Sequence, residues 1–368
     1  MVLKRLFYLL AVVFVLTGAT NFAFAQHEGN EHHEAAEHGH SETKEEKGFN
    51  ASKVIFSHIA DSHYWHLFDW NGHPVSLSLP VIIYHPENGL EMFSASEFHH
   101  GEHPYKGKNG NEYRLESGMK EKIVSADGAA IKDFSLTKNV VSMLISVILL
   151  LVIMTNVAKK YKKNGVMSAP TGFQNALEPV ITFIRDEVAK PNLGNKYMRF
   201  MPLLLTIFFF IWINNLLGLL PGGANFTGNI AVTACLALVT FVVMMAVSNK
   251  HYWGHLLNPP GVPMGIKFLL VPIEIMSMFI KPIALCIRLF ANMMAGHIVI
   301  LSVISMIFIF GAISSVAGWG FAPVSLAFSM FMFLLELLVA AIQAFIFANL
   351  AAVFIGQAIE EPHGDHAH

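Results

Sequence analysis

Charged residues are scarce in this chain. Of its 368 residues, 14% are Asp, Glu, Lys or Arg and 54% are hydrophobic, whereas charged residues make up about 25% of a soluble globular protein. Most of the chain is therefore not an ordinary water-facing domain. The formal net charge of −2 lacks the basic excess of a nucleic-acid binder, so we expect no nucleic-acid partner. The only two cysteines, Cys235 and Cys286, lie in apolar runs, which excludes a disulfide framework.

The charges that are present gather in the N-terminal third. Residues 27–137 contain 13 of the 19 His and 18 of the 26 acidic residues, whereas residues 138–360 hold nearly all the long apolar runs. This division predicts a polar exported segment followed by a membrane domain. We therefore divide the chain into a signal peptide at 1–25, a disordered segment rich in His and Glu at 26–48, a small exported domain at 49–137, a membrane domain at 138–360 and a tail at 361–368.

The N-terminal end has the features of a cleaved signal peptide. Lys4 and Arg5 precede a short apolar stretch, and an Ala-x-Ala cleavage site follows at residues 23–25. The alternative is a first transmembrane helix, but the apolar stretch is short for a span. The histidines of residues 26–48 could bind Zn²⁺ or Cu²⁺. Because no recognisable fold holds them, we favour a solvated tail.

Residues 49–137 are predicted to form a small folded domain with some β-structure. Residues 75–79 alternate apolar and polar side chains, and an apolar stretch follows at 81–84. A Pro-Glu-Asn-Gly turn at 86–89 separates this stretch from residues 90–93, which is typical of a β-hairpin. A second cluster of histidines in this domain has no recognisable metal-ligand spacing, so we predict no metal site.

Three apolar runs are long enough to cross a membrane, at residues 140–158, 201–220 and 230–247. The loop at 159–199 carries eight Lys or Arg residues and the turn at 221–229 carries none. The positive-inside rule therefore places the basic loop in the cytoplasm and the N-terminal domain outside.

The basic loop contains a pattern typical of an amphipathic helix. Residues 171–190 repeat apolar side chains at helical spacing on one face, among them Phe173, Leu177 and Val188. Charged side chains occupy other positions. We expect this helix to lie at the cytoplasmic membrane surface.

The two remaining apolar stretches are too long for ordinary spans. Residues 268–309 and 324–359 contain 42 and 36 residues, so straight helices would be about 63 and 54 Å long, against about 30 Å for a bilayer core. Either each stretch contains two elements, or both are steeply inclined. Because no loop signal divides the second stretch, we predict two long, strongly tilted helices, joined outside the membrane by residues 311–323. The fold class is then an all-α polytopic membrane protein with five transmembrane helices and a cytoplasmic C-terminus.

Ionisable side chains inside these stretches are the most informative feature, because an Arg at mid-membrane costs roughly 2.5–3.5 kcal/mol. Glu274, Lys281 and Arg288 are spaced seven apart and share one helical stripe, which Asn292 extends. Glu274 and Lys281 lie nearer the cytoplasmic end, where we expect them to pair with each other. His297 lies about half a turn round from Arg288 and should face a different neighbour.

Arg288 lies in the middle of its apolar stretch and needs a negatively charged partner, because an arginine does not deprotonate in proteins. The candidates are Glu336, in the last stretch, and a carboxylate from another subunit. Glu336 and Gln343 are also seven apart and share a stripe. His297 and Glu336 both titrate, so either can pass protons along a water-lined path.

Several segments resemble subunit a of the F-type ATP synthases: RLFANMMAGH at 288–297, QAFIF at 343–347, the Lys-Pro pair at 281–282 and NLLGLLP at 215–221. The resemblance covers roughly residues 138–360. It implies a component of the proton-transporting two-sector ATP synthase that is not an enzyme on its own and holds no cofactor or metal.

The resemblance also implies roles for individual residues. In that family the residue matching Arg288 meets the ion-binding carboxylate of each passing c-subunit and blocks a proton leak between two offset half-channels. Gln343 matches the glutamine that faces this arginine, and Asn292 matches a polar residue that lines the path. Glu274 and Asn215 match residues at the proton inlet. The implied partners are the c-subunit ring, the b-subunit stalk, other ATP synthase subunits and the lipid bilayer. The implied location is the bacterial inner membrane, with the N-terminal domain in the periplasm.

Some positions depart from the family pattern. Many bacterial relatives have Glu at the position of His297 and His at the position of Glu336. This exchange keeps one acid and one imidazole, and it predicts that the two side chains lie close together on the proton path. Many relatives also carry an acid where this chain has Gly218, so no role for that acid is carried over. The resemblance says nothing about residues 26–137.

Two other functions are alternatives at this stage. Exported segments rich in His occur in secondary metal transporters, but their membrane sites need clustered ligands, and a lone Arg288 disfavours a bound cation. A structural membrane anchor would leave the buried charges unexplained.

Overall fold

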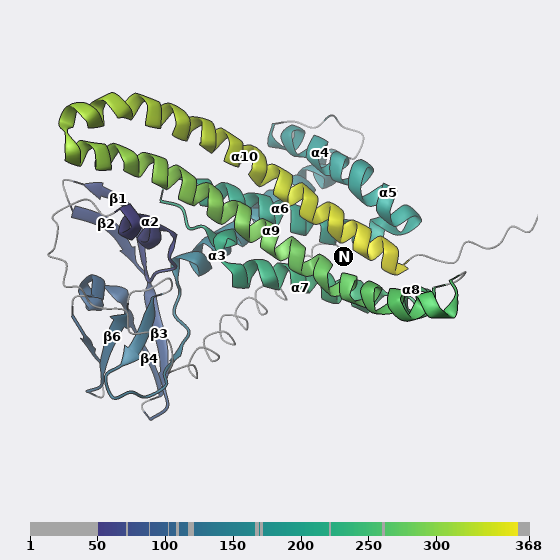
Figure 1. The fold of residues 1–368 in the computed structure, drawn as a ribbon, viewed down its shortest axis with the longest axis horizontal. Coiled ribbons are helices and arrows are strands. Elements are labelled where there is room, and N and C mark those ends of the chain that lie inside the picture. Colours follow the sequence, from purple (N-terminus) through teal and green to yellow (C-terminus); the bar gives the residue numbers. More distant parts are fainter. Residues whose placement is uncertain are drawn as a thin grey trace, which may run out of the picture.

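The computed structural model describes residues 51–359 except 71–72, 88, 102, 108–109, 117–120, 166–168, 170–171, 221 and 260–261. The expected signal peptide, the segment rich in His and the C-terminal tail lie outside the described residues. The described chain forms a strand-rich N-terminal domain beside a bundle of long helices (Figure 1).

The N-terminal domain combines a short helix with small antiparallel sheets. Its described elements are α2 (Ala51–Ile59), β1 (Tyr64–Trp70), β2 (His73–Ser78), β3 (Pro80–His85), β4 (Gly89–Ser94), the 3₁₀ helix η1 (Ala95–Gly101), β5 (Tyr105–Lys106), β6 (Glu112–Glu116), β7 (Lys122–Ser125) and β8 (Lys132–Asp133). β1 pairs with β2, β3 lies between β4 and β8, and β6 lies between β5 and β7. The predicted hairpin is confirmed, because β3 and β4 pair from Pro80 and Ser94 to His85 and Gly89. Gly89 takes a φ of 75° at the turn, which a residue without a Cβ adopts readily.

Aromatic side chains fill the core of this domain. Phe93 on β4 stacks on Tyr105 with ring centroids 3.9 Å apart, and Phe98 packs edge-on against both rings. Tyr113 on β6 is fully buried and donates a hydrogen bond to Oε1 of Glu91 at 3.1 Å. These contacts join the β4-β3-β8 and β5-β6-β7 sheets.

Five stretches of helix in the described chain are long and apolar enough to cross a membrane, as the sequence predicts. They are α3 (Lys138–Asn164), the run Phe173–Leu219, α7 (Ile230–Val247), α9 (Met264–Ile313) and α10 (Ser315–Ile359). Two short elements, η4 (Phe226–Gly228) and α8 (Lys250–Leu257), flank α7.

The run Phe173–Leu219 contains both the predicted amphipathic helix and a span. It consists of α4 (Phe173–Phe183), the π-helical turn η2 (Ile184–Ala189), α5 (Lys190–Leu193), the 3₁₀ turn η3 (Gly194–Lys196) and α6 (Tyr197–Leu219). Leu177 and Val188 are buried, as the helical spacing predicts, but Phe173 is exposed. The location of α4 at the membrane surface stays a prediction.

α6 forms the centre of the helical bundle. Most of its side chains are buried, and it packs against α3, η2 and α10. α9 and α10 form a long antiparallel hairpin (Figure 1). Their 50 and 45 residues correspond to about 75 and 68 Å of helix, so the prediction of two long helices is confirmed. Their strong tilt in the membrane stays a prediction.

The loop predicted at residues 311–323 is wrong. Only Ser314 separates α9 from α10, with a φ of −160° and a ψ of 135°. A Cβ on Gly318 would lie 2.8 Å from Cα of Gly311. These glycines therefore allow two helices to approach closely, and a pair of glycines at a helix contact cannot be told from loop glycines by composition alone.

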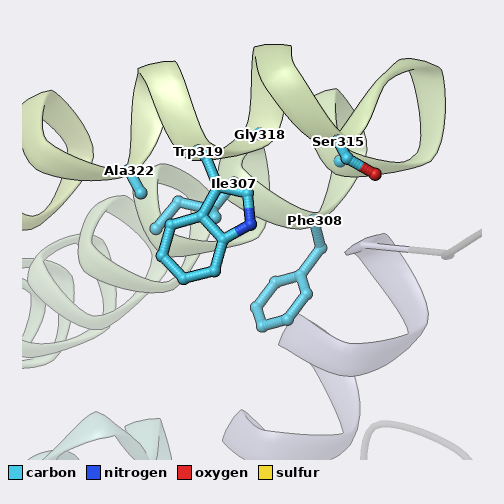
Figure 2. A pocket seen from close by; sticks show the side chains of 7 residues that line it. Ile307, Phe308, Ser315, Gly318, Trp319 and Ala322 are labelled. Atoms are coloured by element: carbon cyan, nitrogen blue, oxygen red, sulfur yellow. The ribbon is translucent and has the colours of Figure 1, made fainter.

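The turn end of the hairpin carries a shallow apolar pocket. Phe308 on α9 and Trp319 on α10 line it on the same side of the hairpin (Figure 2), and both side chains are mostly exposed. Because Trp is enriched at membrane–water interfaces, this end of the hairpin is where we expect one interface to lie.

Candidate functional site

His297 on α9 and Glu336 on α10 form a buried acid–imidazole pair. Nδ1 of His297 lies 3.0 Å from Oε1 of Glu336, and the two side chains are 14% and 4% exposed. The prediction that the exchanged pair is close in space is confirmed. Nδ1 also lies 3.1 Å from the carbonyl oxygen of Met293, and Nε2 lies 3.0 Å from the carbonyl oxygen of Gly218 on α6. Three helices therefore meet at this imidazole.

The hydrogen bonds of this pair require one exchangeable proton. A backbone carbonyl only accepts, so Nε2 of His297 donates its proton to Gly218. The contact between Nδ1 and Glu336 then needs a second proton, carried by the ring or by the carboxyl group. Without that proton, two acceptors would face each other at 3.0 Å. The pair can therefore hold one proton and release it.

The carboxyl group of Glu336 lies against Gly296 of the facing helix. A Cβ on Gly296 would lie 2.6 Å from Cδ of Glu336, so only glycine leaves room for the acid here. Oε2 of Glu336 is buried and has no hydrogen-bond partner among the described residues. Because an unsatisfied buried carboxylate oxygen is costly, this atom is the place where a water molecule or a proton would be stabilised.

Asn215 on α6 belongs to a polar network beside this pair. It is fully buried, donates to the carbonyl of Ala340 at 3.2 Å and accepts a hydrogen bond from Thr227 at 2.8 Å. Asn225 donates to the carbonyl of Met293 at 3.4 Å, the same carbonyl that contacts the imidazole. Sequence reasoning missed Thr227 and Asn225. The signal that could have found them is the occurrence of Asn and Thr in an uncharged turn between two apolar runs.

Arg288 lies on the exposed face of α9. Within the part of the chain that the structure describes, no hydrogen bond or ion pair engages its guanidinium group. Its first candidate partner, Glu336, is held by His297 instead. Exposed apolar side chains on the preceding turns include Ile280, Ile283 and Ile287. A cation on an exposed apolar face needs a partner, which the described residues do not supply.

The other two residues predicted to act with Arg288 are Gln343 and Asn292, and neither is hydrogen-bonded to it among the described residues. Gln343 is buried in α10, and no hydrogen bond between its carboxamide and Arg288 occurs among the described side chains. Asn292 is half-buried, one turn along α9 from Arg288.

The predicted pairing of Glu274 with Lys281 is wrong. A separation of seven residues is about 10.5 Å along a helix, which exceeds ion-pair distance. Nζ of Lys281 instead lies 3.4 Å from Oε1 of Gln357 and 5.6 Å from the ring centroid of Phe354. Glu274 is exposed.

Comparisons with known proteins concern both parts of the chain. The ATP synthase A chain family matches residues 140–356, and a domain of unknown function matches residues 54–142. The chain is 49% identical to ATP synthase subunit a of Chloroherpeton thalassium over 240 residues, 64% of this chain and 70% of that protein. It is 45% identical to subunit a of Chlorobium phaeobacteroides over 241 residues, with coverage of 64% and 68%. With subunit a of Anaeromyxobacter dehalogenans, 36% identity extends over 306 residues, 81% of this chain and 74% of the other.

The residues of the site lie inside the matched region. In the described ranges no group of three or more His, Cys, Asp or Glu side chains is placed to hold a metal ion. The family match spans more than half of the chain and includes every predicted site residue, from Asn215 to Gln343. The chain therefore belongs to the ATP synthase A chain family and is similar throughout its membrane domain to subunit a of F-type ATP synthases.

Proposed function

We propose that this chain is the stator subunit that conducts protons through the membrane sector of a bacterial F-type ATP synthase. It provides two offset half-channels, and Arg288 stands between them. Protons reach and leave a carboxylate on a ring of c-subunits that turns against α9 and α10. The observation that carries this proposal is an arginine on an exposed apolar face that no described side chain pairs with, nine residues along the same helix from a buried pair that holds one proton.

The exposure of Arg288 supports an acidic partner that moves. A guanidinium facing lipid costs roughly 2.5–3.5 kcal/mol or more, and a carboxylate on the ring removes that cost while it is adjacent. The positive charge favours the ionised form of the carboxylate. Because an arginine keeps its proton, it also blocks direct proton transfer from one half-channel to the other. Gln343, buried on the facing helix, supplies a second polar group on the same path.

The inlet half-channel ends at the His297–Glu336 pair. Asn215 and the polar turn after α6 adjoin the pair, and their amide and hydroxyl groups can hold water. Glu274 belongs to the same route. Asn292 lies between the pair and the arginine along α9 and lines the last part of the path.

Proton flow turns the ring in four steps. A proton enters from the periplasm and resides on the His297–Glu336 pair. It then neutralises a c-subunit carboxylate, which can turn into the lipid. After almost a full turn the carboxyl group loses its proton to the cytoplasmic half-channel, and Arg288 stabilises the ion that remains. One charge crossing 100 mV supplies about 2.3 kcal/mol, so several protons serve each ATP.

The architecture suits this role. A steep tilt of α9 and α10 would let two helices of 50 and 45 residues follow the curved side of a ring within a bilayer core of about 30 Å. The basic loop between α3 and α6 faces the cytoplasm, the N-terminal domain faces the periplasm, and the b-subunit stalk holds this subunit against rotation.

The test is to replace Arg288 by alanine in the whole complex. Arg288→Ala should abolish ATP-driven proton pumping while the complex still assembles, because an exposed side chain is not part of the core. Arg185→Ala is the matched control, since Arg185 makes only an exposed ion pair with Asp186, which contributes little. Normal pumping by an assembled Arg288→Ala complex would refute the proposal.

A further inference from the structure

The N-terminal domain sits directly on the part of the bundle that holds the proton-binding pair. Nε1 of Trp65, on β1, donates to the carbonyl oxygen of Gly222 at 2.6 Å. Gly222 follows Gly218 by four residues, and the carbonyl of Gly218 contacts Nε2 of His297. The imidazole therefore contacts the C-terminal end of α6, and the strand domain contacts the turn that follows it.

Helix α2 makes a second contact between the N-terminal domain and the helical bundle. Helix α2 packs against α9 (Figure 1), and the carbonyl oxygen of His58, near the end of α2, accepts a hydrogen bond from Nζ of Lys138 at 3.0 Å. The backbone N–H of Lys138 in turn donates to the carbonyl of Ser62 at 3.0 Å. The start of α3 is thus held to the end of α2, and α2 in turn packs against α9.

His58 is one of several titratable side chains where the end of α2 meets the start of α3. Burial lowers the pKa of its imidazole, and the nearby charges of Lys138, His297 and His66 lower it further. Two acids of the N-terminal domain, Asp61 and Glu121, interact electrostatically with Lys138. The imidazole of His58 is therefore neutral at neutral pH and lies within electrostatic range of His297, and the residue is exposed.

We propose that the N-terminal domain forms the outer mouth of the proton inlet and that His58 passes protons between the outside and the His297–Glu336 pair. This inference rests on the proposed function. Nothing in the family match accounts for His58, which lies outside residues 140–356.

The transfer step needs no other reactant. An outside hydronium ion gives its proton to one ring nitrogen of His58 and leaves as water. The imidazolium then releases the proton on its other nitrogen through water to the basic form of the His297–Glu336 pair. Glu336 is ionised in the basic form of the pair, and its negative charge attracts the proton that His58 releases. Oε2 of Glu336, buried and without a hydrogen-bond partner among the described residues, is an acceptor at the end of this path.

The experiment uses the whole ATP synthase in liposomes, with ATP synthesis driven by a fixed membrane potential and the pH on the uptake side raised stepwise. We expect His58→Gln to lower the rate about threefold at a pH well above 6.5, where protons are scarce, and to change it little below that pH. His103→Gln is the matched control, since His103 is an exposed histidine on the loop after η1 and should behave as wild type.

A rescue experiment separates proton transfer from a structural role. In the His58→Ala complex, imidazole added on the uptake side should restore synthesis, because a free imidazole can carry the same proton. An unchanged pH profile in His58→Gln, or a loss in His58→Ala that imidazole does not relieve, would overturn the inference. Arg288→Ala in the same liposomes keeps the two proposals apart. If Arg288→Ala is inactive and His58→Gln resembles wild type, only the role of His58 fails, whereas an active Arg288→Ala complex refutes the proposed function itself.

Discussion

Replacing Gly296 by alanine should break the hydrogen bond between His297 and Glu336. An added Cβ would lie 2.6 Å from Cδ and 3.1 Å from Cγ of Glu336, inside the usual carbon–carbon contact of about 3.5 Å. Glu336 is 4% exposed and lies in a packed helix contact, so its carboxyl group must rotate away. The 3.0 Å contact with Nδ1 of His297 is then lost.

The size of the effect follows from the role of the pair. A positioned acid–base group contributes about 10²–10⁴-fold to a proton-transfer rate, so we expect pumping by Gly296→Ala to fall by about 100-fold or more. The helix itself is not weakened, because alanine favours a helix by about 1 kcal/mol over glycine. The complex should therefore assemble with a normal content of this subunit.

The assay is ATP-driven acidification of inverted membrane vesicles, with the amount of assembled complex measured in parallel. Gly265→Ala is the matched control on the same helix, because a Cβ there meets no atom within 4 Å. Adding Glu336→Asp to Gly296→Ala shortens the acid and should restore part of the pumping. Wild-type pumping by Gly296→Ala, or no gain in the double variant, would refute the placement of Glu336 against Gly296.

Two further predictions concern histidines that pair with acids: His297 with Glu336, and His63 with Glu121 and Asp133. Exchanging His297 and Glu336 together should retain more ATP-driven pumping than either single change, because the exchange keeps one acid and one imidazole in contact; equal loss in all three would argue against coupling. In the N-terminal domain, burial alone would lower the pKa of His63, but Asp133 and Glu121, at 3.5 and 3.2 Å, raise it to about 9. The folded state therefore favours the imidazolium, and this stabilisation of about 3 kcal/mol is complete below pH 6.5 and declines as the pH rises through 9. Thermal unfolding of the domain in the whole complex should occur at lower temperature at alkaline pH, and His63→Gln should remove that dependence.

Sequence reasoning predicted the features that depend on local patterns. The five spans follow from apolar runs, since the length needed to cross a bilayer is a property of each run alone. The β3–β4 hairpin follows from alternation around a turn that ends at Gly89. The remaining strands are short and pair across the domain, so no local pattern reveals them. The loop at 311–323 was predicted wrongly because glycines serve both turns and close helix contacts.

Local sequence patterns do not show which side chain pairs with each charged group inside the helices. Spacing placed Arg288 and His297 on different sides of one helix, and the exchanged pair pointed to Glu336 as the neighbour of the imidazole. The expected pairing of Glu274 with Lys281 failed because both lie on one helix, too far apart along its axis. The contacts of Thr227 and Asn225 with the site come from a turn whose position depends on how three helices pack.

The amino-acid sequence by itself determined which groups must be satisfied deep inside the apolar helices: Arg288, His297 and Glu336, with Glu274 and Lys281 nearer one end. The tertiary structure decided how they are satisfied. The imidazole meets the acid across 39 residues of chain, whereas Arg288 lies on an exposed face where no described side chain pairs with it. Which side chains meet depends on the rotation and depth of α9 against α10, and those are set by packing over the whole length of both helices.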